Sequence, residues 1–89
     1  IAFHHLFPQA PTHILIIPKV HYTTMNDVPA NESAVFREMM STATQLAKEL
    51  GVEESGYRVV MNCNKDGGQS VYHIHLHLLA GRPLGWPPG

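Results

Sequence analysis

An α+β fold is predicted, in which a meander-like antiparallel sheet packs against one long helix. Residues 12–18, 56–62 and 69–81 have the composition or the two-residue period of strands, whereas residues 31–50 repeat apolar side chains at intervals of three and four. A chain of 89 residues forms one domain at most and buries a modest core. We therefore expect dimerisation or a missing segment, and the start at Ile1 suggests that an N-terminal piece is absent.

The N-terminal half begins with two strand signals. Residues 1–5, IAFHH, predict the end of a strand, and the prolines within residues 7–11 predict a rigid connection because proline fixes φ and lacks a donor. Residues 12–18, THILIIP, are rich in β-branched side chains and should be buried almost throughout. The period of two places Ile14 and Ile16 on one face and His13, Leu15 and Ile17 on the other.

After a loop at residues 19–30, residues 31–50 predict an amphipathic helix. Asn31 can cap its start, Glu32 suits the positive end of the helix dipole, and Gly51 can supply the left-handed residue at its end. The apolar residues of the stripe are Val35, Phe36, Met39, Met40, Ala43, Leu46, Ala47 and Leu50. This stripe is wider than one sheet face needs, which predicts that part of the helix is buried between two protomers.

The two strands of the C-terminal half should form an antiparallel hairpin. Residues 56–62 predict a buried strand, residues 63–68 a turn and residues 69–81 the returning strand. The tail at residues 82–89 is too rich in proline and glycine for regular structure.

Charge and cysteine content exclude several functions. Six basic and seven acidic residues give a net charge of −1, so no basic field is available to bind nucleic acid. No apolar run approaches a membrane span and no signal peptide is visible, so we expect a soluble protein without a membrane partner. The single cysteine, Cys63, favours a reducing compartment, and hence the cytoplasm.

Histidines alternate in residues 70–81, SVYHIHLHLLAG. His73, His75 and His77 would lie on one face of a strand, about 6.6 Å apart. Neighbouring imidazoles repel when protonated and need partners when neutral, so such a row is costly without a role. Each taken alone, His4 and His21 are interpreted instead as satisfied or solvent-facing histidines.

Two kinds of site fit this row. Alternate histidines could bind zinc, with His13 completing the set, but the nearest acidic residue in sequence is Asp66, in the turn. The preceding DGGQS stretch favours a phosphate, because a glycine turn can present backbone amides to an anion, although Gly67 and Gly68 could equally serve the turn alone. Neutral imidazole attacks phosphorus readily, and the resulting P–N bond is labile. No metal or other cofactor is then required.

Several motifs resemble one family. The sequence HIHLHLL, residues 73–79, is similar to the His-x-His-x-His-x-x signature of the histidine triad (HIT) superfamily. Four further stretches resemble its Hint branch, the nucleotide-binding purine nucleoside phosphoramidases: PQAPTHILIIPK (8–19), GYRVVMN (56–62), DGGQSVYHIHLH (66–77) and GWPPG (85–89). The resemblance implies that residues 1–89 form a single HIT domain with a HIT-like fold, whose first helix and leading strand would precede Ile1.

The resemblance also implies catalytic roles. His75 matches the nucleophile that becomes nucleotidylated, His77 a contact of the α-phosphate, and His73 the residue that orients the nucleophile. His13 matches a fourth histidine facing the phosphate, and Ser70 a residue beside the phosphate and leaving group.

The resemblance also implies which residues bind the nucleotide. Gln69 and Gly68 match further contacts near the phosphate, Asn62 a contact near the ribose, and Phe3, Leu6 and Ile14 the lining of the base slot. His5 stands where family members usually carry an acidic residue that holds the ribose hydroxyls. The full expected nucleotide-binding set is His5, Leu6, Asn62, Gly68, Gln69, Ser70, His75 and His77, with no metal ligands.

The function implied is hydrolysis of the P–N bond of purine nucleoside, above all adenosine, 5′-monophosphoramidates through a nucleotidyl-His75 intermediate. The family also implies a homodimer in which Trp86 reaches toward the partner's site, although Trp86 could instead be a local hydrophobic anchor. Two alternatives remain open: a nucleotide-binding adaptor with little catalysis, and a metal-binding protein that uses the histidine face.

Overall fold

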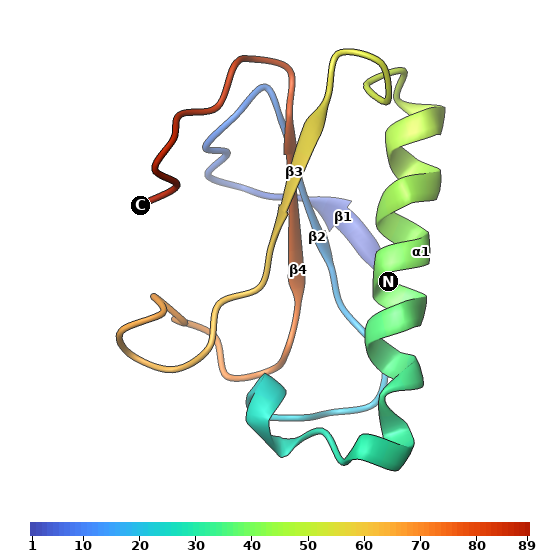
Figure 1. Cartoon of the computed structure of the whole chain (residues 1–89), viewed down its shortest axis with the longest axis vertical. Helices are drawn as coiled ribbons and strands as arrows, with labels where there is room; N and C mark the ends of the chain where they lie inside the picture. The colour runs from blue at the N-terminus through green and yellow to red at the C-terminus, as the bar shows by residue number, and fades with distance from the viewer.

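One helix covers one face of a four-stranded antiparallel sheet in the computed structural model, which describes residues 1–89 (Figure 1). The long helix α1, Ala34–Glu49, connects the second strand to the third, and the strand order is β1-β2-β4-β3. The four strands are β1 (Ala2–His4), β2 (Thr12–Ile16), β3 (Tyr57–Val60) and β4 (Leu76–Ala80). Two short 3₁₀ turns, Met25–Asp27 and Ala30–Glu32, precede α1. The predicted antiparallel sheet with one long helix is confirmed, but the sheet is not the predicted meander, because β4 pairs between β2 and β3.

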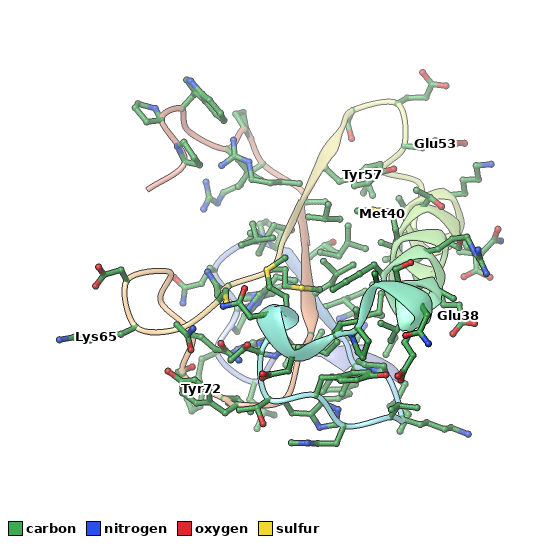
Figure 2. The ribbon with its side chains drawn as sticks, turned by 60° about the horizontal axis from the view of Figure 1, so that its bottom comes forward. Glu38, Met40, Glu53, Tyr57, Lys65 and Tyr72 are labelled. Atoms are coloured by element: carbon green, nitrogen blue, oxygen red, sulfur yellow. The ribbon has the colours of Figure 1, made fainter.

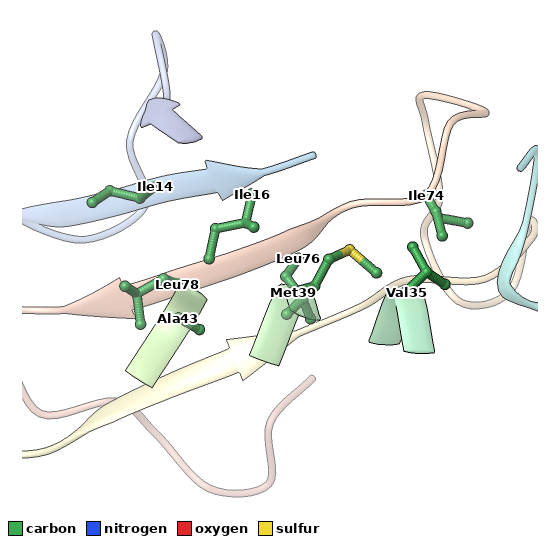
Figure 3. Close-up of a cluster of buried hydrophobic side chains, with 8 residues drawn as sticks. All are labelled: Ile14, Ile16, Val35, Met39, Ala43, Ile74, Leu76 and Leu78. Carbon is green, nitrogen blue, oxygen red and sulfur yellow. The ribbon is translucent and has the colours of Figure 1, made fainter. Parts of the chain in front are cut away.

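The core lies between the sheet and α1 (Figure 3). Ile14 and Ile16 of β2 face it, as the two-residue period predicts, while Leu15 and Ile17 on the other face are only half-buried. Leu78 of β4 is fully buried because it pairs with Ile14 in the centre of the sheet. The buried cluster comprises Ile14, Ile16, Val35, Met39, Ala43, Ile74, Leu76 and Leu78.

The predicted C-terminal strand at residues 69–81 is too long. β4 begins only at Leu76, so His73 and His75 precede it. The Ile74 N–H donates to the carbonyl of Tyr22, 2.9 Å away, rather than to a neighbouring strand. Burial nevertheless alternates as predicted, because Ile74 is buried while His73 and His75 are half-buried. The alternation therefore predicts burial correctly from Ile74 onward, although the hydrogen bonds of this segment go to a loop. It fails at Tyr72, which the same period would bury with Ile74 and which is 45% exposed.

The helix begins later than predicted and ends where predicted. Asn31 lies in a 3₁₀ turn and does not cap α1, and Ser33, at the cap position, makes no side-chain capping bond. The Tyr22 hydroxyl donates to Glu32, which ties this turn to the preceding loop. At the other end Gly51 has φ +71°, and the N–H of Val52 donates to Ala47 at 2.9 Å, so the left-handed ending is confirmed.

The sheet face opposite α1 is bordered by the connections between strands and by the C-terminal tail (Figure 1). Lys65 and Tyr72 belong to the connection between β3 and β4. Figure 2 shows that they lie on the other side of the molecule from Glu38 of α1. The antiparallel pairing of β3 with β4 confirms the predicted hairpin, with a longer connection than the predicted turn. No helix has both the length and the apolar character needed to cross a membrane.

Candidate active site

Four imidazoles from three parts of the chain meet on the face opposite α1. His5 follows β1, His13 lies on β2, and His75 and His77 lie before and within β4. The ring of His5 stacks on that of His13 with centroids 4.4 Å apart, and His77 lies 5.1 Å from His13 and 5.0 Å from His75. We call these four residues the histidine cluster. The sequence predicts that His73, His75 and His77 share a face, which His13 can join; the ring of His73 instead packs against His21, and the close stacking of His5 on His13 is additional.

The hydrogen bond of His75 determines which of its ring nitrogens is free. Its Nδ1 lies 2.7 Å from the carbonyl oxygen of His73. A carbonyl oxygen only accepts, so Nδ1 carries the proton of the neutral ring and Nε2 keeps its lone pair. His75 therefore presents a nucleophilic nitrogen.

Backbone contacts assign the tautomers of His13 and His77 in the same way. The Gln9 N–H donates to His13 Nδ1 at 3.0 Å, so the proton of a neutral His13 ring lies on Nε2. That Nε2–H donates to His77 Nδ1, 2.8 Å away. The proton of His77 is then on Nε2, which makes this nitrogen a hydrogen-bond donor.

Burial and mutual repulsion keep these rings neutral. Burial, and then the neighbouring rings of His75, His13 and His5, lower the pKa of His77 to about 4. Burial and the ring of His5 also lower the pKa of His13. The tautomers assigned to His13 and His77 therefore hold at neutral pH.

His5 cannot accept a hydrogen bond from a ligand. Its Nδ1 accepts from the N–H of Phe7 at 2.9 Å, which leaves Nε2–H as a donor in the neutral ring. The histidine cluster thus exposes one acceptor, His75 Nε2, beside donors on His77 and His5.

The ring of His73 lies apart from the histidine cluster. Its Nε2 donates to the carbonyl of Pro18 at 3.0 Å, and His21 packs edge-on against it with centroids 4.7 Å apart. Only the backbone carbonyl of His73 contacts His75. An orienting role of His73 would therefore be exerted through its main chain.

The DGGQS stretch is held in place by the Gln69 side chain, which bonds to residues on either side of the stretch and to the loop after β2. The side chain of Gln69 is 7% exposed; its Oε1 accepts from Asn64 N–H at 2.8 Å, and its Nε2 donates to Thr23 at 2.8 Å and Val71 at 3.1 Å. We therefore assign this side chain a structural role in place of the expected ligand contact. Sequence alone could not separate a buried amide from one that faces a ligand.

The glycines of the same loop serve the turn. Gly68 has φ +78° and donates to Lys65 at 3.0 Å, while a Cβ on Gly67 would clash with the carbonyl oxygen of Cys63. The Gln69 N–H donates to Asn64 at 3.0 Å, so the amides of Gly68 and Gln69 do not form the expected anion nest. Asn62 Nδ2 donates to Gly67 at 2.7 Å, and Ser70 is exposed.

Two other expectations need correction. Ile14 is 4% exposed in the core beneath α1, so it cannot line a base slot on the histidine face; Phe3 and Leu6 remain exposed. Trp86 is 82% exposed, which excludes a local anchoring role within the chain, although the tail is tethered by the Arg58 guanidinium, which donates to Gly85 at 2.8 Å.

A cavity lies away from the histidine cluster, on the α1 side of the sheet. This cavity of about 500 Å³ lies where the end of β2 meets α1, and its lining includes Ile17, Tyr22 and Met39 but no histidine. No group of three or more histidine, cysteine, aspartate or glutamate side chains is arranged to hold a metal ion.

The fold and the histidine cluster agree with the family comparison: the chain belongs to the HIT domain family, which matches residues 1–84. Among its relatives, the purine nucleoside phosphoramidase of Escherichia coli strain K12 is 54% identical over 84 residues, which cover 94% of this chain and 71% of that protein.

Solved structures show the same relationship. A HIT family hydrolase from Legionella pneumophila Philadelphia 1 superposes with a TM-score of 0.96 at 55% identity, covering 99% of this chain and 79% of that one. A histidine triad protein from Clostridium difficile superposes with a TM-score of 0.93 at 44% identity, covering 94% and 73%.

Proposed function

We propose that the protein hydrolyses the P–N bond of purine nucleoside 5′-monophosphoramidates, with adenosine as the favoured nucleoside. The observation that carries this proposal is the 2.7 Å contact of His75 Nδ1 with the carbonyl of His73, since it leaves Nε2 free to attack. The 54% identity to a purine nucleoside phosphoramidase supports the choice of substrate.

The proposed reaction has two displacements at phosphorus. In the first, the lone pair of His75 Nε2 forms a bond to phosphorus while the P–N bond to the amine breaks, and the departing amine takes a proton from water. In the second, water attacks the nucleotidyl-His75 adduct, the new P–N bond breaks, and its electron pair returns to Nε2; the proton lost by this water neutralises the hydroxide left from the first displacement. The products are the amine and the nucleoside monophosphate, and no metal is used.

His77 and His13 would stabilise the charge that develops on the non-bridging oxygens. The Nε2–H of His77 is a donor next to the nucleophile, since the two rings lie 5.0 Å apart. His13 supports it by donating to His77 Nδ1. A neutral donor held in place in this way needs no reorganisation during the reaction.

For the nucleoside we propose contacts on the same side of the sheet. Phe3 pairs with Leu15, which itself pairs with His77, so Phe3 lies two strands away from the phosphate-binding residues and is 45% exposed. Phe3 and Leu6 are the apolar groups offered to the base. Ser70, Asn62 and Gly68 stay predictions as contacts of the phosphate and ribose.

A homodimer and a cytoplasmic location belong to the same proposal. Met40 is 43% exposed on α1, and β3 is an edge strand whose Tyr57 is 36% exposed. Pairing of α1 and β3 with a second copy would cover both, and Trp86 would then reach the partner's site. The free Cys63 fits a reducing compartment.

The test is turnover of adenosine 5′-phosphoramidate by wild type and His75→Ala, with His4→Ala as a control at an exposed histidine outside the cluster. We expect hydrolysis by wild type and the control and none by His75→Ala, with nucleotide binding retained. Binding without turnover in the wild type would favour an adaptor instead. Zinc retained after dialysis, with activity lost to chelators, would favour a metal protein.

A further inference from the structure

The loop that follows β2 is bonded along its length to the segment that precedes β4. Pro18 accepts from the ring of His73, Tyr22 from the N–H of Ile74, and Thr23 from the side chain of Gln69. These contacts replace the strand pairing that residues 69–75 lack. The position of His73 therefore depends on residues 18–23.

His21 contacts this segment twice. Its Nε2 donates to the carbonyl of Tyr72 at 3.2 Å, and its ring packs edge-on against that of His73, with an interplanar angle of 66°. The carbonyl of Tyr72 belongs to the peptide unit that enters His73. One side chain thus restrains both the backbone before His73 and the ring of His73.

The peptide unit that leaves His73 is fixed from both ends. Its N–H, on Ile74, donates to Tyr22 at 2.9 Å, and its carbonyl accepts from His75 Nδ1 at 2.7 Å. A rotation of this peptide would break the bond that selects the tautomer of His75. His21 precedes Tyr22 directly, so the same short loop holds the peptide units on both sides of His73.

We propose that His21 is a positioning residue for the nucleophile: through the backbone around His73 it keeps the proton of His75 on Nδ1. The effect on turnover rests on the proposed phosphoramidase function, whereas the effect on the tautomer does not. His21 is exposed and contacts neither His75 nor the rest of the histidine cluster, so its influence passes through His73.

The experiment compares His21→Phe, His21→Gln and His21→Ala with wild type and with His4→Phe as a matched control. Phenylalanine keeps a ring against His73 but lacks the donor, whereas glutamine keeps a donor. Nitrogen-15 NMR of the free protein at pH 7 reports which ring nitrogen of His75 is protonated. Steady-state kinetics with adenosine 5′-phosphoramidate separates kcat from KM.

We expect His21→Phe and His21→Ala to show a mixture of His75 tautomers and a kcat lower by about fivefold, the factor expected of one hydrogen bond, at unchanged KM. His21→Gln should restore both properties, and His4→Phe should change neither. A purely structural role would lower thermal stability without altering the tautomer or kcat of the folded protein.

An unchanged His75 tautomer in folded His21→Phe overturns the proposal, whether or not the protein is an enzyme. A wild type that fails to hydrolyse phosphoramidates would refute the proposed function and leave the tautomer comparison decisive. If His21→Ala does not fold, the phenylalanine and glutamine variants decide the question by themselves.

Discussion

His13 Nε2 lies 2.8 Å from His77 Nδ1, a contact that joins β2 to β4 across 64 positions of sequence. It turns His77 into a donor at Nε2, the nitrogen that we propose contacts a phosphoryl oxygen. Loss of one such donor typically lowers kcat about 100-fold, so we expect His77→Ala to lose about that much. His13→Ala should cost less, because His13 acts through His77. Steady-state kinetics checks this order; a larger loss in the His13 variant would contradict it.

Stability should fall in mild acid because of His77. Its pKa is about 4 in the folded protein and about 6.5 in the unfolded chain, so the unfolded state binds the proton first as pH drops. The free energy of unfolding is therefore unaffected by this group above pH 6.5 and decreases between pH 6.5 and 4. Urea midpoints across this range should drop less for His77→Gln, which does not titrate. Parallel curves for the two proteins would count against the assignment.

His5 should weaken the preference for ribose. Its Nδ1 accepts from the N–H of Phe7, so the ring has no acceptor left for a ribose hydroxyl. A carboxylate can accept from both ribose hydroxyls, and such a charged hydrogen bond contributes about 1.5 to 3 kcal/mol. His5→Asp should strengthen binding of adenosine monophosphate more than binding of its 2′-deoxy form. Isothermal titration of both nucleotides measures the difference. Equal shifts for the two sugars would show that His5 does not face the ribose.

The exposed apolar side chain of Met40 should lie in a dimer interface. Sedimentation at micromolar concentration should report a dimer for the wild type and a monomer for Met40→Asp, because a buried unpaired carboxylate is costly. Lys65→Asp, on the opposite side of the molecule from α1 (Figure 2), introduces the same residue as a control and should remain dimeric. A monomeric wild type with full activity would exclude both the dimer and a role of Trp86 at the partner's site.

The sequence predicts side-chain faces better than hydrogen-bond partners. Alternation places Ile74 in the core and His75 on the face opposite α1, because successive side chains of an extended segment point to opposite sides. The same pattern predicts a longer strand than exists, since it cannot reveal that the Ile74 N–H is bonded to Tyr22, 52 positions earlier. The inward turn of the Gln69 amide is missed for a related reason: one of its partners, the carbonyl of Thr23, lies on a distant loop.

The side-chain contacts of histidines outside the triad motif of residues 73–77 are not predictable from the sequence. Nothing in the sequence around His21 distinguishes it from an ordinary histidine. Only the structure shows its ring packed against that of His73. His5 is identified from sequence as a departure from the family pattern, but its stacking on His13 depends on the connection between β1 and β2 folding back. Local periodicity carries no information about such contacts.

Mass spectrometry of the protein quenched during turnover of adenosine 5′-phosphoramidate reports whether His75 Nε2 attacks phosphorus. We predict an adenylyl adduct on the peptide that contains His75, localised to that residue by fragmentation and absent from His75→Ala, whose folding is checked by its thermal unfolding. An adduct on another residue, or turnover by His75→Ala at a rate close to that of the wild type, would contradict the mechanism.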